Sequence, residues 1–460
     1  MAERLLPGVM AARLRPLLVR LDSLLNSRDE QGHAGRASLI AFAIRIASAA
    51  IALVSQVLMA RWMGGFDYGI FVLVWTVMVM AGDISCLGFQ TSIIRFIPEY
   101  REQGRLPELR GVIAAARIFV LVMSGIATAL ALAGVFLFSD AIENYYLLPF
   151  YLGLACLPII ALSDVLEGIA RANGWSARAL GPIYILRPLL ILLLMAGAVL
   201  AGFAPSATVA VICAVAATFL ATFYQLATIM PPAMREVKAQ KPRFLWRHWV
   251  GVSVPIFLVD GFFYLHTNAD ILMIGWFMEP EDVAVYFAVL KLLALVHFVY
   301  FAVKAGVAQR YAQYAHSGQH DALATFARQT VAWTFWPSLA MALVMIVLGK
   351  PMLALFGEGF SSGYLLLFPL MAGVVARAFV GPAESVLTMS GHQKTGAIVF
   401  AITLAFNLAL NFMLIPLWGL WGAAIATATA MLVEASLLAF AVYRKLGIVM
   451  LVPFGRRPSC

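Results

Sequence analysis

Charge is scarce in this chain. Only 12% of its 460 residues are Asp, Glu, Lys or Arg, against roughly 25% in an ordinary soluble domain. Hydrophobic residues make up 63% of the sequence, more apolar surface than one chain of this length can hide in a core. We therefore predict that lipid is the second solvent, and that the chain is an integral membrane protein and not a soluble enzyme.

Cysteine is scarce as well. The four cysteines (Cys86, Cys156, Cys213 and Cys460) show no paired spacing, and three lie inside apolar stretches. This pattern indicates reduced core residues, not a disulfide framework or a metal site. A phosphate-binding glycine loop and a nucleophile elbow are also missing. We expect no catalytic residues, no metal and no cofactor.

Long apolar runs are plentiful. A spanning helix needs about 20 mostly apolar residues, and the alternating pattern of a transmembrane barrel is absent. We predict an all-α polytopic membrane protein with about twelve transmembrane helices. The predicted spans are 37–60, 66–88, 112–136, 149–168, 181–201, 207–230, 248–276, 281–309, 323–348, 362–386, 396–416 and 418–442.

The basic residues predict the orientation. With the N-terminus inside, the inside segments hold 24 Lys and Arg residues, whereas the outside loops hold two, Arg61 and Lys350. This asymmetry predicts that both termini are cytoplasmic. The basic residues that give the net charge of +9 lie between hydrophobic runs. Anionic lipid explains their position better than a nucleic-acid partner does. Residues 1–36 are either an amphipathic segment on the cytoplasmic face or a disordered basic tail.

Two local matches predict duplicated halves. Glu167-x6-Gly174 recurs as Glu384-x6-Gly391, 217 residues later, and the turn at 64–71 is echoed at 279–286, at an offset of 215. Six helices per half in the same orientation are typical of secondary transporters. We predict an N-terminal lobe at 37–230, a cytoplasmic linker at 231–247, a C-terminal lobe at 248–442 and a cytoplasmic basic tail at 443–460.

Six cations fall inside predicted spans. Each would cost roughly 2.5–3.5 kcal/mol at a lipid-facing helix centre, so they either face a cavity, pair with a carboxylate, or extend to the interface. We expect Arg45 and Lys291, which sit deepest, to face a cavity with a positive lining. Arg187, Lys304 and Arg377 are further candidates for binding an anionic head group, and Arg117 is the sixth.

Polar residues mark the expected cavity walls. One face of the first span carries Arg45, Ser48, Ser55 and Gln56. One face of the seventh span carries Ser253, Asp260, Tyr264 and Thr267. Such stripes also hold helices together in lipid, and that alternative stays open. The acids within spans either neutralise the cations or carry a coupling ion. The candidates for these roles are Asp83, Asp164, Glu167 and Glu384, and the other acids within spans are Asp260, Asp270 and Glu434. His266 and His297 are interpreted as packed or hydrogen-bonded histidines.

Two stretches carry a family resemblance. Arg61-x-x-Gly64 followed by Asp67-Tyr68-Gly69-x-Phe71, and Gly88-Phe89-x-x-Ser92-x-x-Arg95-Phe96, resemble the opening of polysaccharide-unit flippases. These belong to the multidrug/oligosaccharidyl-lipid/polysaccharide (MOP) exporter superfamily. The resemblance implies a V-shaped bundle of two six-helix lobes with alternating access. It also implies a polyprenyl-pyrophosphate-linked oligosaccharide as substrate, flipped from the cytoplasmic to the outer leaflet of a bacterial or archaeal plasma membrane.

The partners implied by the resemblance are the lipid-linked oligosaccharide, membrane lipids and other polysaccharide-assembly proteins.

Other functions remain as alternatives. Multidrug-type efflux of small amphipathic cations, coupled to H⁺ or Na⁺, is the second hypothesis, although the first span carries Arg45 and no acid. A membrane-embedded transferase or polymerase is the third; it should show a large external loop or a clustered carboxylate pair, and neither is evident.

Overall fold

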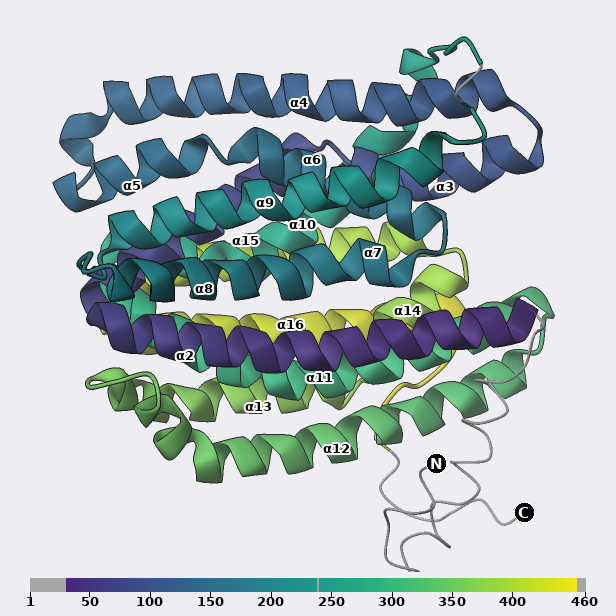
Figure 1. Ribbon diagram of the computed structural model, residues 1–460. Coiled ribbons are helices and arrows are strands. Elements are labelled where there is room, and N and C mark those ends of the chain that lie inside the picture. The colour runs from purple at the N-terminus through teal and green to yellow at the C-terminus, as the bar shows by residue number, and fades with distance from the viewer. Residues whose placement is uncertain (1–29, 238–239, 453–460) are drawn as a thin grey trace, which may run out of the picture.

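The computed structural model describes residues 30–237 and 240–452, all of whose regular elements are helices (Figure 1). The N-terminal half holds α2 (Glu30–Ser85), α3 (Phe89–Glu102), α4 (Leu106–Leu137), η2 (Ser139–Ala141), α5 (Asn144–Leu154), α6 (Leu157–Ala172), α7 (Ser176–Gly181), η3 (Pro182–Leu186), α8 (Arg187–Leu200) and α9 (Ala207–Met234). The C-terminal half holds α10 (Trp246–Phe277), α11 (Pro280–His316), α12 (His320–Ala354), η4 (Phe360–Leu366), α13 (Leu367–Ala378), α14 (Ala383–Met389), α15 (Gln393–Trp418) and α16 (Leu420–Leu446). The all-α class is confirmed.

The α2 helix is a hairpin of two arms. Gly64 has φ 76° and ψ 173°, a backbone conformation that interrupts the helix and that glycine adopts without a steric penalty. The Tyr68 hydroxyl donates to Gln56 Oε1 at 2.7 Å, although residues twelve apart in a straight helix lie about 18 Å from each other. The chain therefore folds back at Gly64. The two arms, residues 30–63 and 65–85, cover the first two predicted spans.

Nine helices among the described residues are long and apolar enough to cross a membrane, or ten if the bent pair α5 and α6, at 47° to each other, is one span. One of the nine is α2, counted once from Ala47 to Ser85 although it is a hairpin. The α10 helix, which carries His266 and Asp270 within its 32 residues, is not among them. The protein is a multi-pass membrane protein, and the number twelve stays a prediction.

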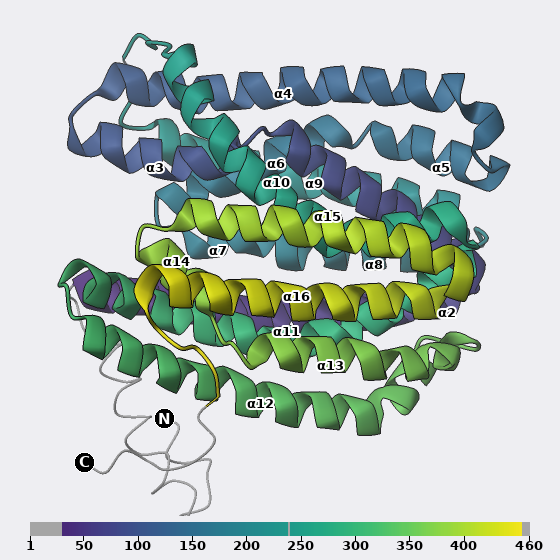
Figure 2. The ribbon, with the colours of Figure 1, turned by 180° about the vertical axis from the view of Figure 1, so that it is seen from behind.

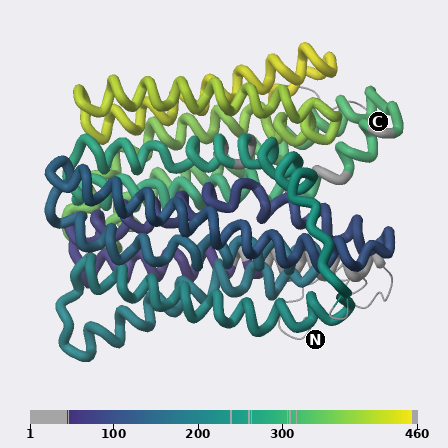
Figure 3. Tube along the Cα trace, turned by 90° about the horizontal axis from the view of Figure 1, so that it is seen from above, coloured from purple at the N-terminus to yellow at the C-terminus, as the bar shows by residue number. Residues whose placement is uncertain are grey.

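The helices run roughly side by side in two groups. Seen from above, the C-terminal helices gather on one side and the N-terminal helices on the other (Figure 3). From behind, α15 and α16 lie beside each other, with α3, α4 and α5 on the far side of α10 (Figure 2). The segments 1–29, 238–239 and 453–460 lie outside the described residues, so the expectations for residues 1–29 and for the end of the basic tail are not addressed.

The two turns that repeat in the sequence meet in space. A Cβ atom at Gly69 would lie 1.7 Å from the backbone oxygen of Pro280, and one at Gly65 would lie 3.3 Å from Cγ of Glu281. Because Gly69 is a glycine, α2 and α11 can approach this closely. Leu73 and Gly275 make a third tight contact nearby. The halves are thus packed together at the end that the charge pattern predicts to lie outside.

The α10 helix joins the two halves. At its start, the Trp249 indole N–H donates to the Tyr100 hydroxyl at 2.9 Å, and the backbone N–H of Arg243 donates to Pro107 O at 3.0 Å. The backbone of Ser253 lies so close to Gly88 that a Cβ there would meet its oxygen at 2.3 Å. The later turns of α10 pack on α15 and α16, and Gly275 near its end also meets Leu73 of α2. One helix is therefore attached to α3 and α4 at one end and to the C-terminal helices at the other.

Candidate functional site

A cavity of about 300 Å³ opens within the N-terminal half, against α10. It is called the N-half cavity here. Side chains from α2, α3, α6, η3 and α8 line it, and α10 contributes Tyr264. The lining residues are Val79, Asp83, Gln90, Thr91, Ile160, Asp164, Glu167, Arg171, Ile183, Tyr184, Arg187 and Tyr264. Five of these, Asp83, Asp164, Glu167, Arg187 and Tyr264, were predicted from sequence as site residues.

Arg187 reaches this cavity after a break in helix geometry. Residues Pro182–Leu186 form a π-helical turn before α8, a feature that often occurs at functional sites. The Arg187 guanidinium lies 5.7 Å from the centre of the Trp75 ring, within cation–π range. Its Nη1 atom is buried without a hydrogen-bond partner among the described residues. A buried donor in this state is open to an acceptor from a ligand.

The N-half cavity contains more acids than bases. Asp164 interacts electrostatically with Asp83, Glu167 and Arg187, and Arg171 approaches Glu167 at 3.9 Å. Three carboxylates therefore face two guanidinium groups. The sequence predicts a positive lining for the site. In the N-half cavity, however, Arg187 lies beside three carboxylates. Such a surface suits a ligand with groups of both signs, or a cation beside an anion.

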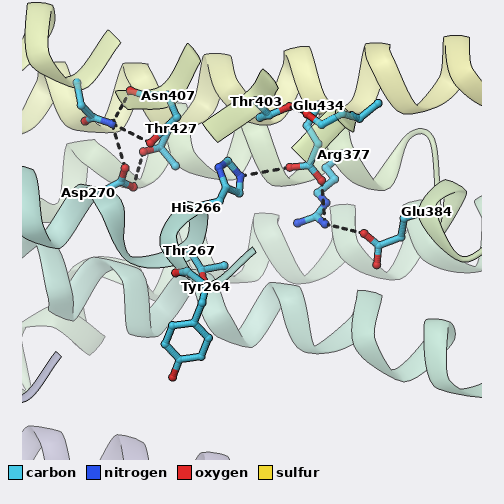
Figure 4. A network of polar contacts seen from close by, with 12 residues as sticks. Tyr264, His266, Thr267, Asp270, Arg377, Glu384, Thr403, Asn407, Thr427 and Glu434 are labelled. Carbon is cyan, nitrogen blue, oxygen red and sulfur yellow. Dashed lines mark hydrogen bonds and ion pairs between the residues drawn. The ribbon is translucent and has the colours of Figure 1, made fainter. Parts of the chain in front are cut away.

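A second polar assembly lies inside the C-terminal half, and we call it the C-half network (Figure 4). Arg377 Nη2 lies 2.9 Å from Glu434 Oε1 and 3.5 Å from Glu384 Oε2. Lys304 pairs with the other oxygen of Glu384. His266 Nε2 lies 3.3 Å from Glu434 Oε2. These five residues come from α10, α11, α13, α14 and α16, so charge pairs join five helices.

The network explains two of the cations found within spans. Lys304 and Arg377 each contact a carboxylate, which is the pairing alternative to a cavity role. Glu434 has no exposed side-chain surface, and Glu384 has 8%. Buried pairs of this kind need both partners, because removing one leaves an uncompensated charge. The Arg377 guanidinium also lies 4.9 Å from the centre of the Tyr300 ring.

A cluster of oxygen and amide groups lies one helical turn further along α10. The Thr427 hydroxyl donates to Asp270 Oδ2 at 2.5 Å, and the Asn411 amide donates to Asp270 Oδ1 at 3.1 Å. The Tyr286 hydroxyl also donates to Oδ2, at 3.2 Å. Asn407 accepts from Asn411 on the same face of α15. Asp270 is thus a buried carboxylate held by neutral donors.

Lys291 differs from the other cations within spans. Its ammonium lies 4.1 Å from the centre of the Phe287 ring. Among the described residues no carboxylate lies within salt-bridge distance of it. The side chain is half-buried. Arg117, by contrast, donates to Ile113 O of its own helix at 3.1 Å.

The predicted polar stripes have mixed outcomes. Gln56 binds Tyr68 across the α2 hairpin, and Ser55 is buried with no hydrogen-bond partner in the described part of the chain. Ser48 is half-buried. Thr267 donates to Tyr264 O at 3.0 Å. The side chains of Arg45 and Asp260 lie outside the described residues.

Sequence reasoning missed several members of these assemblies. Trp75 and Tyr184 contribute aromatic surface next to Arg187. Asn407 and Asn411 hold the Asp270 cluster together. Two asparagines four residues apart in an otherwise apolar span put two amides on one helix face, a signal that could have identified them. In the described part of the chain, no group of three or more His, Cys, Asp or Glu side chains could hold a metal ion.

Comparison with protein families gives two matches. A family model described as "Polysaccharide biosynthesis protein" matches residues 34–309, and one described as "MatE" matches residues 255–413. The first covers more than half of the chain. No curated protein matches the sequence.

Several solved structures share the fold. An inward-facing "multidrug resistance MATE family transporter of the MOP superfamily" superimposes with a TM-score of 0.69 at 16% identity, over 94% of this chain and 98% of that one. The lipid II flippase MurJ, in an inward closed conformation, gives 0.65 at 15% identity, over 88% and 87%. A MOP superfamily transporter from Pyrococcus furiosus, whose binding pocket is described as having reverse polarity, gives 0.58 at 14% identity, over 92% and 97%.

Proposed function

Because this chain belongs to the polysaccharide biosynthesis protein family, within the MOP superfamily of membrane transporters, we propose that it flips a polyprenyl-pyrophosphate-linked oligosaccharide. The substrate moves from the cytoplasmic to the outer leaflet by alternating access. The protein then resides in a bacterial or archaeal plasma membrane with both termini cytoplasmic. Membrane lipids and other polysaccharide-assembly proteins are its partners.

The observation that carries this proposal is Lys291. The α11 helix begins at Pro280, so Lys291 lies about 16 Å along it, near the middle of a hydrocarbon core of about 30 Å. Its ammonium lies against the Phe287 ring, and no carboxylate of the described residues lies within salt-bridge distance of it. An unpaired cation at this depth is costly and marks a substrate path. A pyrophosphate group supplies the charge and the acceptors that an ammonium lacks there.

Arg187 supplies a second contact for the same group. Its guanidinium has a buried Nη1 without a partner in the described structure, and it faces the N-half cavity beside polar side chains such as Gln90, Thr91 and Tyr184. Hydroxyl and amide groups of this kind suit sugar hydroxyls. We propose that the pyrophosphate binds between Arg187 and Lys291, with the first sugar against the N-half cavity.

Efflux of amphipathic cations is the second candidate, and one observation favours it. Asp83, Asp164 and Glu167 give the N-half cavity three carboxylates against two arginines. A cationic drug would seek this excess of negative charge. The two functions place opposite demands on Lys291, because a cation repels a cationic substrate and attracts an anionic one.

The test uses the protein reconstituted in liposomes with a fluorescent polyprenyl-pyrophosphate sugar. Transfer between leaflets is compared for wild type, Lys291→Ala and the control Lys350→Ala, whose exposed side chain lies near the end of α12. Loss of a charge-assisted contact of about 1.5–3 kcal/mol should slow transfer at low substrate roughly 10- to 150-fold in Lys291→Ala alone. Equal rates in all three proteins would exclude Lys291 as an anion contact. Export of a cationic dye that becomes faster in Lys291→Ala, without lipid transfer, would favour the second candidate.

A further inference from the structure

A cavity of about 810 Å³, larger than the N-half cavity, lies between the two halves. Glu279 and Asp282, which flank Pro280, line it, so it lies beside the contact of Gly69 with Pro280. We call it the outer-end pocket, because the charge pattern predicts this end to lie outside. The α2 and α5 helices form one wall, and the end of α10 and the start of α11 form the other. Its volume is that of a small-molecule site, about 300–1,000 Å³.

The lining of the outer-end pocket is acidic. It includes Glu143, Glu279 and Asp282, and none of the described lining residues is Lys or Arg. In the rest of the described chain, no basic group lies within salt-bridge distance of these three carboxylates. Their places at the starts of α5 and α11 favour acids, but do not explain why both helix starts face one pocket. A pyrophosphate is repelled here, whereas a neutral or cationic group is not.

Aromatic side chains form much of the apolar lining. The ring centres of Tyr145 and Tyr146 lie 4.8 Å apart, and the ring centre of Phe150 lies 6.0 Å from that of Tyr146. Trp276 and Phe277 come from α10 on the other wall. A place at the membrane–water interface explains the Trp276 side chain, which is 80% exposed. It does not explain Tyr146, which is 6% exposed.

The Tyr146 hydroxyl distinguishes between the ligands that such a lining accepts. It is buried and has no hydrogen-bond partner among the described residues, although a buried tyrosine hydroxyl usually finds one. A sugar hydroxyl both donates and accepts hydrogen bonds, whereas an ammonium only donates them. A sugar can therefore bind the carboxylates and also accept from Tyr146. An organic cation binds the carboxylates and leaves the Tyr146 O–H without an acceptor.

We propose that the outer-end pocket binds the sugar unit of the substrate as it leaves, and that it takes neutral sugars in preference to acidic ones. The proposal deepens the proposed function and rests on it. Sugar hydroxyls donate charge-assisted hydrogen bonds to Glu143, Glu279 and Asp282. The apolar C–H face of the sugar ring lies against an aromatic face, such as that of Tyr145 or Trp276. The same carboxylates keep the pyrophosphate out of the pocket.

The two cavities follow each other along the same helices. On α10, Tyr264 lines the N-half cavity and Leu272 lines the outer-end pocket, about 12 Å further along the helix axis. On α2, Val79 lines the first and Leu73 the second. A sugar that moves from the N-half cavity toward the contact of the two halves therefore reaches the outer-end pocket. Because its walls belong to different halves, the pocket changes shape when the halves move.

The first test measures binding without a lipid carrier. The protein, labelled with fluorotryptophan and held in lipid nanodiscs, is titrated with the methyl glycosides of glucose, galactose, mannose, rhamnose and N-acetylglucosamine. Fluorine NMR follows the ten tryptophans, and the signal missing from Trp276→Phe belongs to Trp276. We expect at least one glycoside to shift this signal, with a Kd of about 1–10 mM. Shifts confined to other tryptophans, or a Trp276 shift with tetramethylammonium and no glycoside, would overturn the proposal.

Two variants test the chemistry of the pocket. Tyr146→Phe removes only the hydroxyl and should weaken glycoside binding about three- to tenfold. Glu279→Gln removes one negative charge and should raise the affinity for methyl glucuronide, relative to methyl glucoside, by about three- to tenfold. Glu358→Gln, an exposed acid between α12 and η4 that does not line the pocket, is the matched control and should change neither. A glucuronide preference that is the same in wild type and Glu279→Gln would overturn the proposed selectivity.

The second test separates the outer-end pocket from the proposed function. Transfer of fluorescent polyprenyl-pyrophosphate sugars is measured in liposomes, with a neutral or an acidic sugar unit on the same lipid. We expect faster transfer of the neutral one, and a smaller difference in Glu279→Gln. Transfer that is the same in wild type, Tyr146→Phe and Glu279→Gln would support flipping and overturn the sugar site. Glycoside binding at Trp276 without transfer of any lipid-linked sugar would support the site and count against the proposed function.

Discussion

Arg377 and Glu434 form the centre of the C-half network: Nη2 and Oε1 lie 2.9 Å apart, and the carboxylate has no exposed surface. One partner is on α13 and the other on α16, two helices that pack closely together. Glu384 and His266 extend the pair in opposite directions. The helices of this half are therefore held by charge as well as by close packing, in a part of the chain where water cannot replace a lost partner.

Removing Arg377 should destabilise the protein strongly. Arg377→Ala leaves Glu434 and Glu384 without their shared cation, and breaking a buried pair costs about 3–5 kcal/mol. We expect a clear fall in the midpoint of thermal unfolding in detergent. Arg328→Ala, on the exposed surface near the start of α12, serves as the control and should change it little.

The double variant Arg377→Leu with Glu434→Leu separates pairing from packing. If the cost in Arg377→Ala comes from an unpaired Glu434, the double variant should be more stable than the single one, because apolar pairs can replace buried ion pairs. A double variant with the summed loss of both single variants would mean that the two side chains act independently.

Gly69 should control the contact between the two halves. A Cβ atom there would lie 1.7 Å from Pro280 O, which no backbone adjustment within rigid helices can absorb. Gly69→Ala should therefore separate α2 from α11 at this end and shift the population toward the state that is open there. Spin-label distances between the Gly64 turn of α2 and the start of α11 should lengthen. Gly125→Ala on α4, where nothing lies within 4 Å of the added atom, should leave them unchanged.

Much of the architecture was predictable because its signals are local. Apolar runs separated by polar turns predict helices, and the all-α class and the superfamily fold are confirmed. The turn at Gly64 was located because it separates the apolar runs 37–60 and 66–88, and it contacts the start of residues 279–286, which match it in sequence. The number of spans stays a prediction, because the count of nine or ten helices applies to the described residues alone.

The site was harder to predict because its contacts are distant in sequence. Lys304 and Glu384 are 80 residues apart, and nothing in either span indicates the other, so a cavity role and an ion pair could not be separated. Arg187 meets Trp75 only after the π-helical turn at Pro182–Leu186. His266 was interpreted as a packed or hydrogen-bonded histidine, and its spacing does not indicate that its partner is Glu434 on α16. Each of these outcomes depends on which helix faces lie together.

The Tyr68–Gln56 hydrogen bond should stabilise the α2 hairpin by a modest amount. It joins the two arms at 2.7 Å, and Tyr68 is fully buried. Tyr68→Phe keeps the ring and removes the hydroxyl, leaving the Gln56 amide oxygen without its donor. We expect a loss of about 1–2 kcal/mol, seen as a fall in the unfolding midpoint. Tyr443→Phe on the exposed face of α16 is the matched control, and an equal effect of both would show that the hydrogen bond contributes nothing.

The predicted orientation can be tested with single cysteines in a background where the four native cysteines are replaced. Ser139→Cys lies in the turn after α4, and Ser176→Cys lies at the start of α7. The excess of Lys and Arg in the segment around 171–178 predicts that position 176 is cytoplasmic and position 139 is outside. In intact cells a membrane-impermeant maleimide should therefore label position 139 and leave position 176 unlabelled until the cells are opened. Labelling in the opposite order would invert the topology. The end closed by Gly69 and Pro280 would then face the cytoplasm, and the proposed direction of transport would be reversed. The depth of Lys291 and His266 in the membrane would not change.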